Sequence, residues 1–303
     1  MEQLNILEVR KLNKSFKGKK VLNDVTFNLK RGEIVGFIGP NGAGKTTTMK
    51  CICNLIFPDS GEIFIDGFDL VTNRNKAISK LAAVIENPGL FSDLTGRENI
   101  EMISELKGIN KNRTNEIVEF VGIGKNIDKK TSTYSMGMKQ RLGLGIAIIS
   151  KPSLLILDEP TNGLDPTGVM VLRSTLKDLV NKEGITILFS SHQLGEVEKL
   201  ADRLIFIDNG IVTEIPDKIH LESKYLIKCS DISKTYEIIN NLNRMLKPEI
   251  VLKDTVTISI STESEFNQVI HCLIKSGIDI HDIIKESFDI ESIYKVYYGD
   301  KYE

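Results

Sequence analysis

The chain has few cysteines, no long apolar run and almost no net charge, and each shortage excludes a class of protein. None of its four cysteines lies in a C-x-x-C pair, so no zinc-binding spacing is present and we expect reduced, partly buried thiols. No apolar stretch approaches the roughly 18 residues that a membrane-spanning helix needs. The formal net charge of −2 creates no overall basic field that would attract nucleic acid or anionic lipid.

The length of the chain and its N-terminus predict the number of domains and the location of the protein. The 303 residues exceed the usual size of one compact domain, which predicts one large and one small domain. The segments with candidate functional residues end near Ile215-Pro216-Asp217. We therefore expect the domain boundary there, with domains at residues 1–215 and 216–303. Charged residues at the N-terminus take the place of a signal-peptide core, and the expected location is therefore cytosolic.

The most informative segment is a glycine-rich loop that follows the apolar run 34–38. It fills every fixed position of the phosphate-binding pattern G-x-x-x-x-G-K-[ST] with Gly39, Pro40, Asn41, Gly42, Ala43, Gly44, Lys45 and Thr46. Glycines let successive backbone N–H groups surround phosphates, and the helix that begins at Thr46-Thr47 points its positive end at them. A turn that binds nothing is the alternative, but the flanking strand and helix favour a nucleotide. Lys45 then serves the β and γ phosphates, and the Thr46 hydroxyl is offered to Mg²⁺.

Two carboxylates follow the apolar run 154–157. Asp158 and Glu159 stand at the carboxyl end of this expected strand, which would place Asp158 beside the phosphate loop. There Asp158 can hold Mg²⁺, and Glu159 can orient or deprotonate an attacking water. In isolation the two would be solvated acids at the end of a strand, but next to a phosphate loop they predict a catalytic pair.

The pattern of apolar runs predicts an α/β fold with a doubly wound core. Residues 4–38 alternate short apolar and polar runs and predict strands of an antiparallel edge. The inward-facing residues of this edge are expected to be Val21, Val25, Phe27 and Leu29. Residues 97–150 are mostly helical in pattern. The continuous apolar runs 154–157, 186–189 and 204–207 alternate with helices, which is typical of a parallel sheet buried on both faces.

The last part of the chain predicts a small α+β domain of ferredoxin-like βαββαβ order. The expected elements are a strand at 225–230, a helix at 232–246, a hairpin of 249–252 with 255–260, a helix at 263–276 and a strand at 278–284. A final helix is expected from Asp289. We see no catalytic constellation in this domain.

Three further segments resemble motifs of the ATP-binding cassette (ABC) family. The segment from Tyr134 to Arg141, which reads Tyr-Ser-Met-Gly-Met-Lys-Gln-Arg and precedes a helix expected at 142–150, resembles the family's signature. Asn162-Gly163-Leu164-Asp165 is similar to its D-loop, and Ser190-Ser191-His192 to its switch-histidine segment. With the phosphate loop, these motifs follow the family's order within residues 4–215, about two-thirds of the chain.

This resemblance implies a P-loop NTPase of ABC type that binds and hydrolyses ATP. Its fold would combine a parallel core sheet, an antiparallel edge sheet and a helical subdomain. Phe16 stands where such proteins place an aromatic ring on adenine. Closure around ATP would drive the coupled work, and hydrolysis would reopen the protein.

The resemblance also implies that two copies of the chain share the nucleotides. The Ser135 hydroxyl and the N–H groups around Met136, Gly137 and Met138 would face the γ-phosphate held by a second copy. Two ATP molecules would then be sandwiched in a head-to-tail homodimer, with Asp165 connecting its halves. His192 would contact the γ-phosphate and position the hydrolytic water. Seen alone, Ser135 would be an ordinary helix N-cap and His192 a structural histidine.

The sequence departs from the common ABC pattern at two places. Glu86 stands where most members have a glutamine that touches Mg²⁺ and water, and the signature has Met136 and Met138 for its first glycine and its glutamine. A carboxylate can ligate Mg²⁺ more strongly than an amide, but it adds a negative charge near the phosphates. We therefore expect Glu86 to join Thr46 and Asp158 at the metal and hydrolysis to be slower or differently coupled.

Glu86 to Phe91 and Leu94 to Asn99 are similar to the ABC branch that serves bacitracin resistance and lantibiotic self-immunity. The resemblance implies the energy-coupling subunit of a peptide-antibiotic exporter, peripheral at the cytoplasmic face of the membrane. Its partners would be separate integral membrane permease subunits, without direct contact to the cargo. Residues 87–100 would meet these subunits, with Leu90, Phe91 and Leu94 as exposed anchors; the alternative is that the three pack against the chain's own helices.

Two other functions remain open at this point. The same architecture serves exporters of drugs, sodium or lipids, and the residues of an ATPase that never surrounds its cargo do not name that cargo. A soluble ABC ATPase acting on DNA or ribosomes is disfavoured, because no sustained heptads separate Lys45 from Ser135 and only one phosphate loop is present. We expect no nucleic-acid partner.

Overall fold

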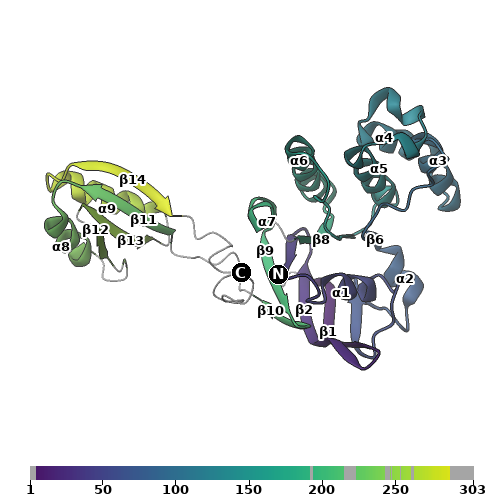
Figure 1. Ribbon diagram of the computed structural model, residues 1–303, viewed down its shortest axis with the longest axis horizontal. Coiled ribbons are helices and arrows are strands. Elements are labelled where there is room, and N and C mark those ends of the chain that lie inside the picture. The colour runs from purple at the N-terminus through teal and green to yellow at the C-terminus, as the bar shows by residue number, and fades with distance from the viewer. Residues whose placement is uncertain are drawn as a thin grey trace. The chain divides into compact units, whose positions relative to one another are not determined.

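The chain forms two compact units, residues 1–216 and 217–303, which are described separately. The computed structural model describes residues 5–191, 194–214, 223–242, 246, 248–252, 254–260 and 263–286. Figure 1 shows the two sheets and helices of the first unit and the smaller α+β second unit. Within the described ranges, every helix is too short or too polar to cross a bilayer.

An antiparallel sheet of four strands begins the first unit. Its order is β2-β1-β4-β5, built from β1 (Asn5–Phe16), β2 (Lys19–Lys30), β4 (Ser60–Ile65) and β5 (Phe68–Asp69). Val25, Phe27 and Leu29 face the core as predicted, but Val21 does so only in part, and Leu22 is fully buried in its place. The alternation of buried and exposed residues along β2 shifts by one residue at Asp24. The φ of +51° at Asp24 and the irregular strand pairing around it mark a β-bulge.

A second sheet of six strands forms the centre of the first unit. Its order is β10-β9-β3-β8-β7-β6. The strands are β3 (Ile34–Ile38), β6 (Leu81–Val84), β7 (Leu154–Leu157), β8 (Thr186–Ser191), β9 (Arg203–Asp208) and β10 (Ile211–Glu214). All neighbours pair in parallel except β9 and β10. The assignment of all of residues 4–38 to the antiparallel edge is therefore wrong for β3. Its five residues are all buried, as expected for a strand covered on both faces.

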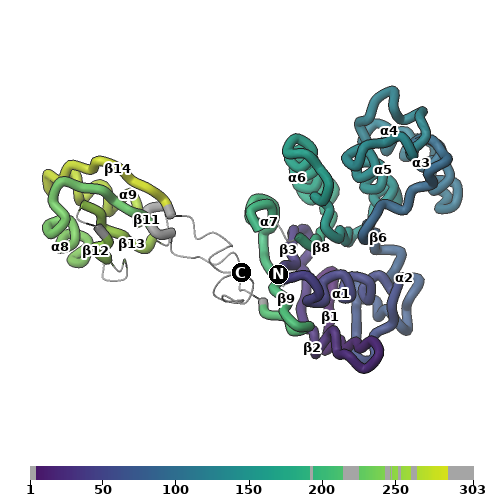
Figure 2. The backbone as a smooth tube through the Cα atoms, viewed as in Figure 1, coloured from purple at the N-terminus to yellow at the C-terminus, as the bar shows by residue number. Residues whose placement is uncertain are grey.

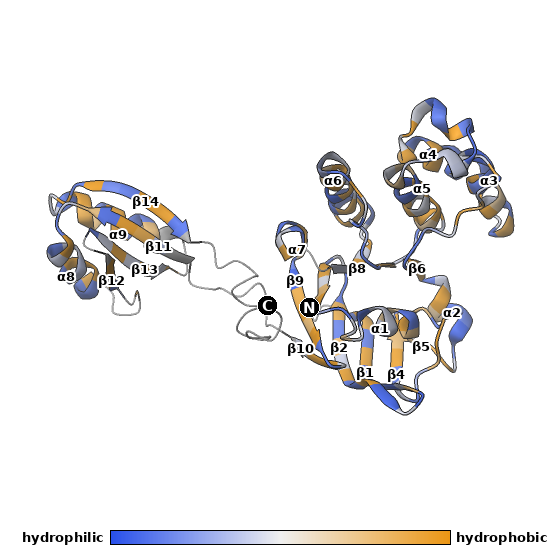
Figure 3. Cartoon of the chain, in the orientation of Figure 1, coloured by the Kyte–Doolittle hydropathy of each residue, from blue (hydrophilic) through white to orange (hydrophobic). Residues whose placement is uncertain are grey.

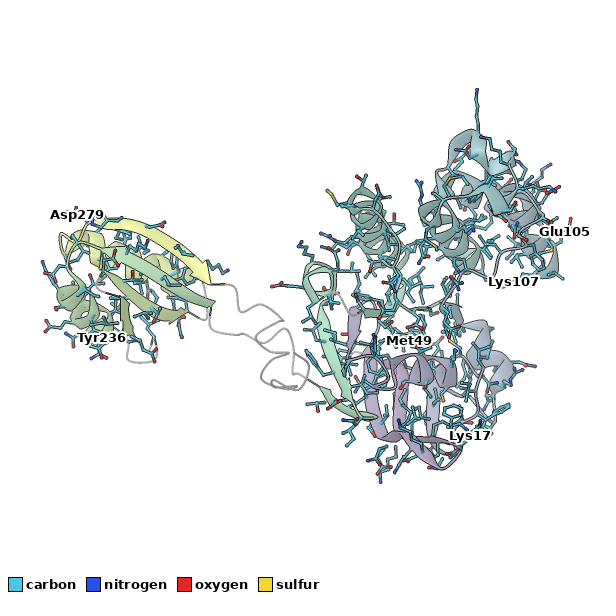
Figure 4. All side chains as sticks on the ribbon, in the orientation of Figure 1. Lys17, Met49, Glu105, Lys107, Tyr236 and Asp279 are labelled. Atoms are coloured by element: carbon cyan, nitrogen blue, oxygen red, sulfur yellow. The ribbon has the colours of Figure 1, made fainter. Side chains whose placement is uncertain are left out.

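The two sheets share an apolar core that encloses the first helix. The helix α1 (Lys45–Ile52) contributes Met49, Cys51 and Ile52, all fully buried, to a cluster with residues of both sheets. Figure 4 labels Met49 in this interior, and Figure 3 shows the apolar strands around it. All four cysteines are free, and burial raises the pKa of Cys51 to about 11 and that of Cys53 to about 12.

A helical subdomain lies between β6 and β7 in the chain. It contains α3 (Gly96–Leu106), α4 (Lys111–Val121), the 3-10 turns Gly124–Asp128 and Thr131–Thr133, and α5 (Met136–Ile148). The tube in Figure 2 shows α3, α4 and α5 packed together apart from the two sheets. The helix predicted at 142–150 begins six residues earlier, because Ser135 caps it and the glycines at 137, 143 and 145 do not interrupt it. The remaining helices of the unit are α2 (Arg74–Ser79), α6 (Pro166–Glu183) and α7 (Leu194–Leu200).

The second unit has the predicted βαββαβ order. Its elements are β11 (Ser223–Cys229), α8 (Ile232–Leu242), β12 (Glu249–Leu252), β13 (Thr255–Ile260), α9 (Glu263–Lys275) and β14 (Ile280–Glu286). The strands form an antiparallel sheet of order β12-β13-β11-β14, and an apolar cluster of its own joins this sheet to α8 and α9. The ferredoxin-like arrangement is thus confirmed. The helix expected from Asp289 lies outside the described residues.

A buried ion pair joins β9 to the turn between β2 and β3. The Arg203 guanidinium on β9 donates to both carboxylate oxygens of Glu33, at 2.8 and 3.3 Å, and both side chains are almost fully buried. Replacing Arg203→Met leaves the Glu33 carboxylate buried without this partner, so we expect a loss of about 3 kcal/mol of unfolding free energy in urea titrations followed by circular dichroism. The exposed Arg10→Met is the matched control, with an expected change below about 1 kcal/mol; equal effects would contradict the prediction.

Candidate nucleotide-binding site

The glycine-rich loop connects the end of β3 to the start of α1. A Cβ at Gly39 would lie 2.2 Å from the carbonyl oxygen of Ile207, and one at Gly44 would lie 2.8 Å from Leu22 Cδ2. Gly44 also has a φ of +113°, in the left-handed region that side chains rarely adopt. Only glycine therefore fits at these two positions, and the path of the loop backbone is determined by its neighbours.

Lys45 is buried at the start of α1 and holds its ammonium against the loop. Its Nζ donates to the carbonyl oxygens of Gly39 at 2.6 Å and of Pro40 at 3.2 Å. Burial lowers the pKa of Lys45, while the charges of Glu159 and Asp158 act in the opposite direction. The ammonium is thus placed beside the loop and within the field of both carboxylates.

The carboxylate of Asp158 is the centre of a hydrogen-bonded group. Its Oδ2 accepts from the Thr46 hydroxyl at 2.9 Å, and its Oδ1 accepts from the Ser190 hydroxyl at 2.6 Å. Ser190 Oγ in turn accepts from the backbone N–H of Glu159 at 2.8 Å. The structure therefore brings together the phosphate-loop helix, the end of β7 and the end of β8 at one buried acid.

A pocket of about 430 Å³ lies over the loop. The expected residues that line it are Asn41, Gly42, Gly44, Lys45, Thr46, Thr47 and Glu159. Two unexpected residues, Val21 and Asn162, complete the lining. Glu159 has a φ of +50°, so its backbone turns away from the direction of β7 directly after Asp158. The glycine loop and Glu159 thus line the same pocket.

The signature and the D-loop line a second, separate pocket of about 490 Å³. Ser135 caps α5 by accepting from the Met138 N–H at 3.3 Å, and Ser135, Met136, Gly137 and Asp165 all border this pocket. Asp165 caps α6 by accepting from the Gly168 N–H at 3.0 Å. No residue is shared with the lining of the phosphate-loop pocket. Within one copy, the structure does not bring Ser135 to the phosphate loop.

Glu86 forms an ion pair with a residue of α1. Its Oε1 lies 2.6 Å from the Nζ of Lys50 on α1, and its side chain is mostly exposed. Its φ of +62° is unusual for a residue with a Cβ. Among the residues that the structure describes, no group of three or more His, Cys, Asp or Glu side chains could hold a metal. The contact of Glu86 with Mg²⁺ stays a prediction.

The other expected residues lie at the margins of this arrangement. Phe16 ends β1 with a half-exposed ring and does not line either pocket. Phe91 is exposed, as expected for an anchor that meets membrane subunits. Leu90 and Leu94 are half-buried, as expected if they pack against the chain's own helices. His192 lies outside the described residues; β8, which precedes it, ends at Ser191.

Two residues of the site were not predicted from the sequence. Ser190 was placed only in the switch segment, although the pairing of Leu157 with Phe189 puts the next residues, Asp158 and Ser190, side by side. Parallel register could have indicated this contact. Gln140 on α5 donates from Nε2 to the Pro160 carbonyl at 2.9 Å and so connects the signature helix to the loop after Glu159. No local pattern signals this contact, because it joins two elements distant in the sequence.

Removing the Ser190 hydroxyl should disturb the catalytic pair without touching the phosphate loop. We expect Ser190→Ala to retain ATP affinity and to lower the rate of ATP hydrolysis by about tenfold or more, since Asp158 and the Glu159 backbone lose a shared hydrogen-bond partner. Turnover and fluorescent-nucleotide binding measure the two effects. Ser174→Ala on an exposed face of α6 is the control, and a normal rate for Ser190→Ala would contradict the interpretation.

Comparison with known proteins places the chain in a family. Residues 22–162 match the family described as ABC transporter. The ABC transporter ATP-binding protein YhcH of Bacillus subtilis is 35% identical over 94% of this chain and 93% of its own length. The bacitracin transport ATP-binding protein BcrA of Bacillus licheniformis is 41% identical over 70% of each chain. The lantibiotic transport ATP-binding protein SrtF of Streptococcus pyogenes is 40% identical over 73% of this chain and 91% of its own.

A solved structure gives the same result for the fold. The cbiO1 protein of Clostridium perfringens, described as part of the ABC transporter complex cbiONQ, is 30% identical with a TM-score of 0.62 over 69% of this chain and 87% of its own. The resemblance of the motifs is confirmed, and the relatives agree with the branch that the segment around Glu86 indicates. The chain belongs to the ABC transporter family and is one of its ATP-binding cassette ATPases.

Proposed function

We propose that this chain is the ATP-hydrolysing subunit of an exporter that removes a peptide antibiotic or bacteriocin through separate membrane subunits. ATP hydrolysis is supported by one observation, the hydrogen-bonded group beside the Lys45 loop. This group consists of Thr46, Asp158, Ser190 and Glu159. The cargo class is supported by the relatives named for bacitracin and lantibiotic transport, at 41% and 40% identity. The Glu86 segment supports the same branch.

The residues around Asp158 fit a magnesium ion. The Thr46 hydroxyl and the Asp158 carboxylate provide hard oxygen atoms 2.9 Å apart at the mouth of the phosphate loop. Mg²⁺ is usually bound by one or two protein oxygens together with phosphate oxygens and water, which matches this small donor set. When bound, the ion supplies charge neutralisation for the phosphates. Glu86 would take part only after leaving Lys50.

The chain's own groups then divide the work of hydrolysis. The loop N–H groups and the Lys45 ammonium stabilise the charge of the β and γ phosphates. Glu159 is the general base that accepts the proton of the attacking water, and Ser190 holds its backbone in place. His192 would contact the γ-phosphate from the end of β8.

A single copy offers the two halves of the site in different pockets. The phosphate loop lines one pocket and the Ser135 segment lines the other, with no residue in common. A head-to-tail pair of copies would join the loop of one to the Ser135 segment of its mate, and each of two ATP molecules would be enclosed between them. Asp165, which borders the second pocket, would lie near this junction.

The transport step would follow from closing and opening this pair. Closure on ATP would move the permease subunits, and hydrolysis would release them. The exposed Phe91 is the best-placed anchor for a permease segment, since Leu90 and Leu94 are partly covered. The chain would thus be peripheral at the cytoplasmic face of the membrane and would not touch its cargo.

The proposed cargo class predicts a phenotype in the strain that carries the gene. Disrupting the gene should increase sensitivity to bacitracin or to nisin-like lantibiotics, and a wild-type copy should restore resistance. A Glu159→Gln copy should fail to restore it, because ATP still binds but the base for hydrolysis is lost; the loss of turnover should be about a hundredfold or more.

The same strains provide the controls for this experiment. An exposed-site variant, Glu119→Gln on α4, should restore resistance as the wild-type gene does. Unchanged sensitivity to every peptide would eliminate the proposed cargo, and increased sensitivity only to unrelated drugs would assign another. Normal hydrolysis by purified Glu159→Gln protein would remove Glu159 from its role.

The shared site predicts complementation between two inactive proteins. Lys45→Ala breaks the loop half and Ser135→Arg breaks the signature half, so each alone should be inactive. In an equimolar mixture half of the dimers carry one complete site, and ATP hydrolysis should return to about a quarter of the wild-type rate. A mixture of Lys45→Ala with Asp158→Asn is the control, since both changes damage the same half. Equal recovery in both mixtures, or none in either, would contradict the head-to-tail arrangement.

A further inference from the structure

A three-residue contact lies beside the aromatic ring at the end of β1. The Nζ of Lys14 is 2.9 Å from Oδ1 of Asp59, and Oδ2 of the same carboxylate accepts from the Ser15 backbone N–H at 2.6 Å. The Asp59 N–H donates to the Asn13 carbonyl at 2.8 Å. Bonds from Lys14 and from the Ser15 N–H hold the pKa of Asp59 below its usual range. The carboxylate therefore binds both the strand backbone and the lysine ammonium.

The same ammonium also contacts the Phe16 ring. Lys14 Nζ lies over this ring, 5.4 Å from its centroid. The Lys14 side chain is only 16% exposed, whereas Phe16 is 43% exposed. One face of the ring is thus covered by a cation whose charge is already balanced by Asp59. The rest of the Phe16 side chain is partly exposed to solvent.

Phe16 sits on a hairpin that reaches the phosphate-loop pocket. It pairs with Lys19 across the turn marked by Lys17 in Figure 4. Two residues along β2, on the same face as Lys19 in an extended strand, Val21 lines the pocket over the loop. A nucleotide with its phosphates on the loop could therefore extend its base toward the hairpin that carries Phe16.

A half-exposed ring at the end of a strand would otherwise have several rotamers available. Ordering such a side chain when a ligand binds costs free energy, and a contact that orders it beforehand reduces that cost. A cation over a ring face supplies such a contact, and Asp59 keeps the cation there. In the proposed function Lys45 and the loop amides serve the phosphates, so Lys14 is not needed for them.

We propose that Lys14, held by Asp59, is a positioning residue that orients Phe16 as the stacking surface for the base of the bound nucleotide. This inference rests on the proposed function, because it assumes that ATP binds with its base at Phe16. In this proposal Lys14 makes no contact with the phosphates. Replacing Lys14 should therefore weaken the binding only of ligands that have a base.

The test compares ATP with inorganic tripolyphosphate, which has the phosphates but no base. Dissociation constants for both, with Mg²⁺, are measured on the full chain in a Glu159→Gln background so that ATP stays intact. Lys14→Met should weaken ATP binding by about two- to fivefold, the range of a cation–π contact at an exposed site, and leave tripolyphosphate binding unchanged. Lys14→Arg should retain ATP affinity, since it keeps the cation. Lys20→Met, on an exposed position of the same hairpin, is the control and should change neither constant.

Two further variants separate the possible outcomes. Phe16→Ala should remove most of the preference for ATP over tripolyphosphate, and Asp59→Asn should weaken ATP in the same direction as Lys14→Met. Since methionine keeps the packed stem and Asp59 is 45% exposed, Lys14→Met should fold normally, and its thermal midpoint checks this. An unchanged ATP affinity, or an equal loss for both ligands, overturns the role of Lys14 while the ATPase proposal stands. If the parent protein binds neither ligand, the proposed function itself fails.

Discussion

The rest of the nucleotide site depends on the way the Asp158 carboxylate is held. One oxygen accepts from Thr46 and the other from Ser190, so a helix start and two strand ends meet at one buried acid. This is possible because β3, β7 and β8 run in parallel and bring their carboxyl ends to the same edge of the sheet. The glycine loop is packed closely against this edge, because Gly39 lies against Ile207 and Gly44 against Leu22.

The same edge is connected to the helical subdomain by a few contacts. Gln140 donates to the Pro160 carbonyl, directly after Asp158 and Glu159, and Lys50 on α1 forms an ion pair with Glu86, which lies between β6 and the helical subdomain. A shift of α5 relative to the sheet would therefore be felt next to Glu159. These contacts join the subdomain that carries the signature to the residues next to the phosphate-loop pocket, which the subdomain itself does not line.

Local patterns were sufficient to predict much of this molecule from its sequence. The phosphate loop, the strand before Asp158 and the antiparallel hairpin at 249–260 each depend on neighbours in the chain, and the structure has them where expected. The predictions were wrong where contacts between residues distant in the sequence determine the structure. The partner of β3 is set by sheet assembly, and the phase of β2 by a bulge at Asp24. Strand pairing and bulges of this kind leave no periodic pattern of apolar residues in a single sequence.

The raised pKa values of Cys51 on α1 and of Cys53 at its C-cap have a chemical consequence for the helix that follows the phosphate loop. Only a thiolate attacks electrophiles, and burial raises the pKa of Cys53 to about 12, so its sulfur is almost entirely protonated at neutral pH. Cys51, with a pKa of about 11, is scarcely more reactive and is fully buried. Cys51 on α1 and Cys53 at its C-cap, which are two of the chain's four cysteines, should therefore react slowly with oxidants and alkylating agents.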